Sequence, residues 1–154
     1  LAADPFVPAD DSSWAQLAVE RAEFPGFLSR LDILSVHVPL TPQTRGMIDK
    51  AALALLPKGA YLVNTARGEV VDEAALAAAL HSGQLAGATI DVFAQEPFPA
   101  QSLYVGVPNL VLSPHVSGVT RDSNLRISLL VAENVRRALK GETPSVADAA
   151  ASAR

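Results

Sequence analysis

The fold is decided by residues 60–92, which read AYLVNTARGEVVDEAALAAALHSGQLAGATIDV. The stretch opens and closes on short apolar runs, Ala60 to Asn64 and Ala88 to Val92, which are typical of buried strands. Between them, Asp72 can cap a helix that the alanine- and leucine-rich run continues to Gly83. A strand, a helix and a second strand in this order, joined by short loops, predict a parallel βαβ unit.

The same alternation extends on both sides of this unit. Further strands are predicted at the other short apolar runs: Leu1 to Ala3, Ile33 to Val38 and Leu110 to Leu112. Further helices are predicted from the Asp49 cap to Leu56 and from Asp122 to Lys140, the second with one apolar face. Because the strands are apolar on both faces, we expect them to be buried in an α/β, Rossmann-like, doubly wound parallel sheet.

The composition is that of a chain with an apolar core. Of 154 residues, 49% are hydrophobic, and 12 basic against 16 acidic residues leave a net charge of −4. An acidic balance without a basic run argues against nucleic acid or a membrane surface as a partner. The apolar stretches are also far shorter than the ~20 residues of a membrane span. Without cysteine there is no thiolate metal site, so no metal is predicted and a reducing, cytoplasmic location is expected.

Polar side chains collect where the predicted strands end. Ligands bind beyond the carboxyl ends of an open parallel sheet, so these residues should meet at one edge: Asp4, His37, Asn64, Thr65, Arg67, Asp91, Glu96 and His115. Considered singly, Asp4 or His37 is equally well explained as a solvated loop residue or a cap. Gly68 after Arg67 permits a tight turn close to a ligand, and prolines beside Glu96 and His115 restrict their backbone. Together the residues predict a ligand site.

Three motifs carry a resemblance to a known family. Residues 32–49 read DILSVHVPLTPQTRGMID, residues 55–97 contain NTARG and DVFAQEP, and residues 109–118 read NLVLSPHVSG. From Asp4 to about Ser145 the chain resembles the nucleotide-binding domain of the D-isomer-specific 2-hydroxyacid dehydrogenases, which include phosphoglycerate dehydrogenase and glyoxylate/hydroxypyruvate reductase. The resemblance implies hydride transfer between NAD and a small 2-hydroxy acid or 2-oxo acid.

The resemblance also implies a catalytic trio. Arg67 would bind the substrate carboxylate and 2-oxo group, because a planar guanidinium can meet both oxygens. His115 would be the acid/base, since an imidazolium can protonate the alkoxide formed at C2. Glu96 would orient His115, because a carboxylate hydrogen-bonded to an imidazole fixes the ring and favours its charged form.

The cofactor contacts implied by the resemblance lie in the same loops. Asp4 would accept hydrogen bonds from the adenosine ribose, which favours NAD over NADP because a 2′-phosphate would face a carboxylate. The remaining contacts would come from the residues after the other strands: His37, Val38, Pro39, Thr65, Ala66, Arg67, Asp91, His115, Ser117 and Gly118. Among them, Asp91 would hold the carboxamide.

The resemblance further implies that parts of the family's pattern are missing. The phosphate-binding GxGxxG turn precedes the acidic residue by roughly 20 positions, whereas three residues precede Asp4. We therefore expect residues 1–146 to form a partial NAD(P)-binding domain that lacks its first strand and helix, and residues 147–154 an alanine-rich tail, without the substrate domain. The isolated chain would then be inactive, and the full-length protein a homodimer, with Val119 to Leu130 as a candidate contact surface.

Other functions remain open on the residues alone. An NAD-sensing corepressor or scaffold can use the same fold and retain the same trio, and phosphite oxidation is a further alternative. Formate dehydrogenase is disfavoured, because its pattern has glutamine where this chain has Glu96. His81 matches no motif and is expected to be a solvated helix residue.

Overall fold

The computed structural model describes residues 1–144, so the tail predicted at 147–154 and the domain limit predicted at 146 lie outside the described residues. The chain forms two compact units, which divide between His115 and Val116 and are described separately. In the described part of the chain, no helix is both long and apolar enough to span a membrane.

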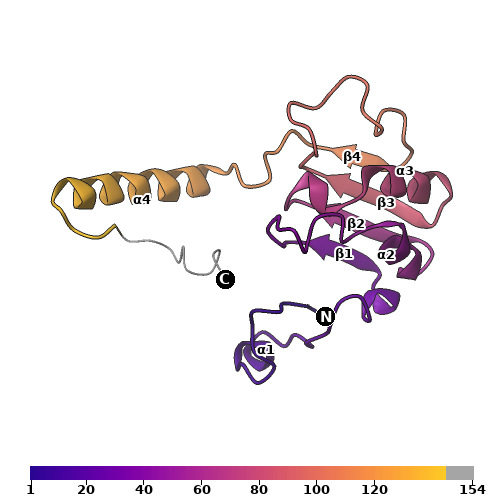
Figure 1. Ribbon diagram of the computed structural model, residues 1–154, viewed down its shortest axis with the longest axis horizontal. Helices are drawn as coiled ribbons and strands as arrows, with labels where there is room; N and C mark the ends of the chain where they lie inside the picture. The colour runs from indigo at the N-terminus through magenta and orange to yellow at the C-terminus, as the bar shows by residue number, and fades with distance from the viewer. Residues whose placement is uncertain (145–154) are drawn as a thin grey trace. The chain divides into compact units, whose positions relative to one another are not determined.

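The first unit contains a parallel four-stranded sheet whose strand order, β1-β2-β3-β4, follows the chain (Figure 1). Its strands are β1 (Ile33–Val36), β2 (Ala60–Asn64), β3 (Leu85–Ile90) and β4 (Leu110–Leu112). The predicted α/β sheet is confirmed, although β1 ends earlier than predicted and β3 begins and ends earlier.

The strand predicted at Leu1 to Ala3 is wrong. Ala2 instead forms an isolated parallel bridge with Arg21, in which the Ala2 amide donates to the Glu20 carbonyl at 3.0 Å. The segment therefore pairs with the chain just after the short helix α1 (Ser13–Gln16), not with the sheet. A three-residue apolar run is too short to specify its partner.

Two helices of the first unit begin at the predicted aspartate caps. They are α2 (Lys50–Leu55) and α3 (Glu73–His81). The Asp49 carboxylate accepts from the Ala52 amide at 2.8 Å, and the Asp72 carboxylate accepts from the Ala75 amide at 2.9 Å. The residues before the caps, Ile48 and Val71, are buried and bridge to each other. This bridge joins the starts of the two helices.

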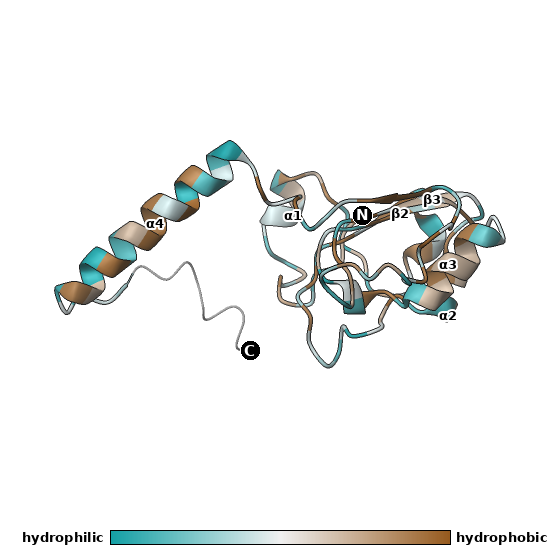
Figure 2. Cartoon of the chain, turned by 90° about the horizontal axis from the view of Figure 1, so that it is seen from above, coloured by the Kyte–Doolittle hydropathy of each residue, from teal (hydrophilic) through white to brown (hydrophobic). Residues whose placement is uncertain are grey.

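Only one face of the sheet is buried, so the predicted burial on both faces is wrong. Figure 2 shows α2 and α3 on the same side of β2 and β3. Residues on that side, such as Leu34 and Leu62, belong to the core, whereas Ile33, Tyr61 and Val111 on the other face are 58%, 51% and 61% exposed. The exposed residues are themselves apolar, which is why the sequence pattern did not distinguish the two faces.

Two short 3-10 helices complete the first unit, η1 (Leu28–Arg30) and η2 (Gly68–Val70). Leu28 is fully buried in the core at one end of β1. The η2 turn directly follows Arg67 and leads into α3. It thus connects the candidate site to a capped helix.

The second unit contains the helix α4 (Arg121–Leu139), close to the predicted limits. Thr120 caps it by accepting from the Ser123 amide at 3.0 Å. Within the described part of the chain, α4 has no buried residue, and hydrophobic and hydrophilic positions alternate along it (Figure 2). The predicted amphipathic helix is confirmed, whereas its use as a contact surface stays a prediction.

Candidate active site

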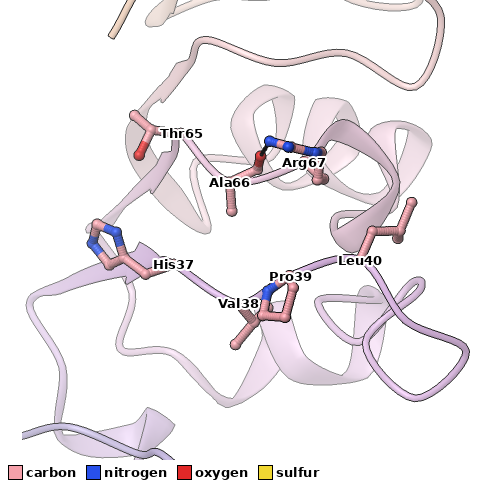
Figure 3. Close-up of a pocket in the computed structure, with 7 residues that line it drawn as sticks. All are labelled: His37, Val38, Pro39, Leu40, Thr65, Ala66 and Arg67. Carbon is pink, nitrogen blue, oxygen red and sulfur yellow. Dashed lines mark hydrogen bonds between the residues drawn. The ribbon is translucent and has the colours of Figure 1, made fainter. Parts of the chain in front are cut away.

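A groove of about 500 Å³ lies at the carboxyl ends of β1 and β2. Figure 3 shows that two short segments line it: His37, Val38, Pro39 and Leu40 after β1, and Thr65, Ala66 and Arg67 after β2. All of these except Leu40 were predicted from the sequence. Leu40 directly follows the predicted residues, and its position in the same loop was the available signal.

The loop after β2, residues 64–68, is held from inside by Asn64; we call it the Arg67 loop. Asn64 is 1% exposed. Its side-chain oxygen accepts from the Ala66 amide at 3.0 Å, and its side-chain nitrogen donates to the Arg67 carbonyl at 2.9 Å. Both polar ends of the side chain therefore bind the loop that lines the groove. The sequence placed Asn64 at the site edge but assigned no role to its side chain.

Gly68 fixes the other side of the Arg67 loop. A Cβ at this position would collide with the backbone of Phe93 and Ala94, the segment that follows β3. The φ angle of Gly68 lies outside the left-handed region. The turn predicted at this glycine is present, because η2 begins at Gly68, and the approach of a ligand to it stays a prediction. Gly68 is required because two backbone segments touch there.

The side chain of Arg67 is exposed at the groove. Its Nη1 donates to the Ala66 carbonyl at 2.6 Å, the bond drawn in Figure 3. This bond uses one of the five N–H donors of the guanidinium, so the planar fork keeps capacity for an anion. The position combines a fixed main chain with a side chain whose charged end is accessible.

Glu96 and His115 form a direct pair, which we call the acid/base pair. Nδ1 of His115 lies 2.9 Å from Oε2 and 3.1 Å from Oε1 of Glu96, and the side chains are 46% and 39% exposed. The hydrogen bond from His115 holds the pKa of Glu96 below its ordinary value, with help from the Phe93 amide and the charge of Arg67. Of the three side chains predicted as a trio, the structure thus joins His115 and Glu96 directly, whereas Arg67 lines the groove.

The loop that carries Glu96 is anchored to α3 and to the end of β4. The Ala94 amide donates to the Glu73 carboxylate at 3.1 Å, and the Phe93 amide donates to Glu96 at 3.0 Å. Beside them, the hydroxyl of Ser113 donates to the buried carboxylate of Asp91. Elements far apart in sequence therefore converge on the same end of the sheet.

The chain matches a known protein family over most of its length. The sequence profile of the D-isomer specific 2-hydroxyacid dehydrogenase NAD binding domain matches residues 1–117. The chain belongs to this family. The family resemblance stated from the motifs is confirmed.

Individual relatives of the dehydrogenase family cover most of the chain. It is 52% identical over 140 residues to the (S)-sulfolactate dehydrogenase of Chromohalobacter salexigens, covering 90% of this chain and 45% of the relative. The apo D-mandelate dehydrogenase of Rhodotorula graminis superposes with a TM-score of 0.81 at 33% identity, covering 94% of this chain and 42% of that one.

A third relative was solved with a cofactor. The D-isomer specific 2-hydroxyacid dehydrogenase of Xanthobacter autotrophicus Py2, in complex with NADPH and MES, superposes with a TM-score of 0.71 at 42% identity, covering 82% of this chain and 53% of that one. The chain thus spans about half the length of these three relatives. The cofactor in that relative is NADPH, whereas Asp4 of this chain led to the prediction of NAD.

Some residues that the dehydrogenase motifs predicted do not line the groove. The described lining does not include Asp4, whose carboxylate accepts from the Phe6 amide at 2.9 Å in a local turn. His37 does line it, and its Nε2 lies 2.8 Å from the Ser35 hydroxyl. Ser117 and Gly118 belong to the second unit. The predicted contacts of these residues with a cofactor stay predictions.

The residues present fit the nicotinamide end of the cofactor that this family's domain binds. The groove has apolar walls in Val38, Pro39 and Ala66, which suit the faces of a flat ring. Thr65 supplies a hydroxyl on the same wall. The apolar walls and this hydroxyl therefore suit a flat ring that carries a polar group. Asp91, which was predicted to hold the carboxamide, follows β3 and does not line the groove; its buried carboxylate accepts from the Ser113 hydroxyl.

Proposed function

We propose that the complete protein is a nicotinamide-dependent oxidoreductase that interconverts a small 2-hydroxy acid and its 2-oxo acid. The observation that carries the proposal is the acid/base pair, in which Nδ1 of His115 lies 2.9 Å from Glu96, on loops that follow strands of the same parallel sheet as the Arg67 loop. A carboxylate, an imidazole and a guanidinium at one sheet edge are the groups that this reaction requires. The bound nicotinamide would supply or accept the hydride.

Arg67 would bind the substrate. A 2-oxo acid carries a carboxylate and a carbonyl oxygen side by side, and the guanidinium fork can donate to both. Such charge-assisted hydrogen bonds contribute about 1.5–3 kcal/mol each. The Nη1 hydrogen that binds the Ala66 carbonyl can be exchanged for a substrate oxygen, and the other four N–H donors of the guanidinium are available without any exchange.

His115 would move the proton at the substrate oxygen on C2. Glu96, whose pKa is lowered, is a carboxylate at neutral pH and can only accept hydrogen bonds. Nδ1 of His115, 2.9 Å away, must therefore carry the hydrogen, which leaves Nε2 to donate to or accept from the substrate. Glu96 thus selects the ring nitrogen that performs the acid/base step.

The remaining assignments rest on the sequence. Asp4 favours NAD over NADP, and Asp91 would hold the carboxamide. The homodimer and the cytoplasmic location are expected from the family resemblance and the absence of cysteine. The relatives described above are dehydrogenases, which supports an oxidoreductase over a corepressor or scaffold.

The decisive experiment measures NADH and NADPH oxidation by the complete protein. The substrates are glyoxylate, hydroxypyruvate, pyruvate, 3-phosphohydroxypyruvate and sulfopyruvate, with phosphite and NAD in the reverse direction. We expect reduction of at least one 2-oxo acid. Arg67→Ala and His115→Asn should lower kcat/KM by about 10³-fold, the scale of lost oxyanion binding or acid/base catalysis.

Matched controls separate chemistry from charge removal. Arg30→Ala removes an exposed arginine paired with Glu20, and His81→Ala removes an exposed helix histidine. Both should retain the original rate. Full activity in Arg67→Ala or His115→Asn would refute the proposal, as would turnover of phosphite with no reduction of any 2-oxo acid.

A further inference from the structure

The strongest unassigned feature of the site is the side chain of Asn64. A buried amide is costly unless its polar atoms are paired. Asn64 pairs both of its atoms, and both partners, the Ala66 amide and the Arg67 carbonyl, lie in the Arg67 loop. Its own carbonyl accepts from the Asp91 amide at 3.0 Å and so continues the pairing of β2 with β3. The residue therefore connects the rigid sheet to the loop.

The hydrogen bond that the Arg67 side chain makes to its own loop explains why the loop needs a separate connection to the sheet. The guanidinium binds the Ala66 carbonyl at 2.6 Å, so its own loop competes with any anion for that donor. When the guanidinium turns to an anion, this contact no longer steadies the main chain. The hydrogen bonds from Asn64 do not involve the guanidinium and persist in both arrangements. They can hold the backbone of Arg67 while its side chain moves.

We propose that Asn64 is a positioning residue that sets the direction of Arg67 toward a 2-oxo acid. The inference rests on the proposed function, because it assigns to Arg67 the binding of the substrate carboxylate. The new claim is that the affinity of Arg67 for the substrate carboxylate depends on the two hydrogen bonds that the Asn64 side chain makes with the Ala66 amide and the Arg67 carbonyl. Small errors in the position of a binding group are costly, since a displacement of about 1 Å can lower a rate 10²-fold.

The test is a double-mutant cycle in the complete protein. Asn64→Ala should raise the KM for the preferred 2-oxo acid by about 10- to 100-fold, with a smaller change in kcat. In the Arg67→Ala background the same change should alter KM by at most about twofold, because the residue it positions is gone. An equal effect in both backgrounds would overturn the proposal.

A milder variant and a matched control accompany the cycle. Asn64→Asp keeps the size of the side chain and the acceptor for the Ala66 amide, but it loses the donor to the Arg67 carbonyl. It should raise KM in the same direction. The control is Gln84→Ala, because Gln84 also donates its side-chain amide to carbonyls, those of Leu53 and Leu56 at 3.3 and 2.8 Å. It should leave KM unchanged.

Hydrogen exchange at the Ala66 amide gives a readout that does not depend on activity. Asn64→Ala should accelerate this exchange at least about tenfold, whereas Gln84→Ala should not. Unchanged protection of Ala66 in Asn64→Ala would overturn the proposal even if activity fell. If the protein reduces no 2-oxo acid, the proposed function fails, and the exchange experiment still decides whether Asn64 holds the loop.

Discussion

The Arg67 loop and the acid/base pair serve the same candidate site but are held by different forces. The Arg67 loop is fixed by a buried, uncharged amide and by the backbone contact at Gly68. The acid/base pair is held by an ionic hydrogen bond between side chains that are 46% and 39% exposed. The position of the Arg67 backbone should therefore be insensitive to pH and salt, whereas the geometry of the acid/base pair depends on charge.

The largest expected effect comes from Gly68→Ala. The new methyl group must displace the backbone of Phe93 or Ala94, and overpacking against backbone should lower the free energy of unfolding by about 3 kcal/mol. Thermal or urea unfolding of the complete protein measures this loss. The control is Gly26→Ala, where a Cβ would meet its nearest atom, the Glu23 carbonyl oxygen, at an ordinary 3.5 Å. Equal stability of the two variants would show that the backbone contact does not hold the loop.

Next in size is Glu96→Gln, which tests the charged side of the comparison. The amide keeps the shape of the carboxylate but removes the charge that orients His115. We expect kcat to fall about 10- to 100-fold, less than in His115→Asn, because the imidazole remains. Steady-state kinetics of the complete protein measures kcat. The control is Glu20→Gln, which removes the carboxylate charge from a different ion pair, that of Glu20 with Arg30. An unchanged kcat would show that the charge of Glu96 does not contribute to proton transfer by His115.

A smaller effect is expected from Asp72→Ala. Asp72 lies two residues after the η2 turn and caps α3. Loss of the cap bond to the Ala75 amide should cost about 1 kcal/mol of stability. Because Asn64 and Gly68 hold the loop independently of this cap, KM for the 2-oxo acid should not change. A rise in KM would mean that the loop depends on α3 rather than on the sheet.

The smallest expected effect is the pH dependence of the contribution that the acid/base pair makes to the stability of the fold. The pKa of Glu96 is lower in the folded chain than its ordinary value of 4.5. Its contribution to stability is therefore complete above about pH 4.5 and is lost as the pH falls through the lowered value. Exposed ion pairs contribute about 0–1 kcal/mol.

Unfolding of the wild type and Glu96→Gln, compared from pH 7 to pH 3, measures this contribution. The difference between the two should shrink only at the acid end. The same comparison for Asn64→Ala should show no such dependence, because its hydrogen bonds are uncharged. A difference for Glu96→Gln that grows on acidification would contradict the assigned direction.

Local signals in the sequence were sufficient for the four strands of the sheet and for the starts of α2 and α3. The caps Asp49 and Asp72 are each followed within a few residues by the amide they bind, so the helix starts could be read directly. The strands β2 and β4 were predicted with their observed limits. Since all strands are parallel, knowing where each ends also indicated which side chains share an edge.

Contacts between distant segments were not predictable in the same way. The need for Gly68 arises from Phe93 and Ala94, which follow a different strand. The open face of the sheet was missed because Ile33 and Tyr61, which are partners in register across β1 and β2, are apolar although exposed. Burial depends on which element covers a residue, and no local pattern states that.

The strand order β1-β2-β3-β4 has a consequence for how the chain assembles during synthesis. Each strand pairs with the one made just before it, so every pairing closes a segment of roughly 20 to 30 residues. No pairing in the described sheet has to wait for a distant partner. The β1–β4 region can therefore grow strand by strand as it leaves the ribosome, and the two halves of the groove meet as soon as β2 docks on β1.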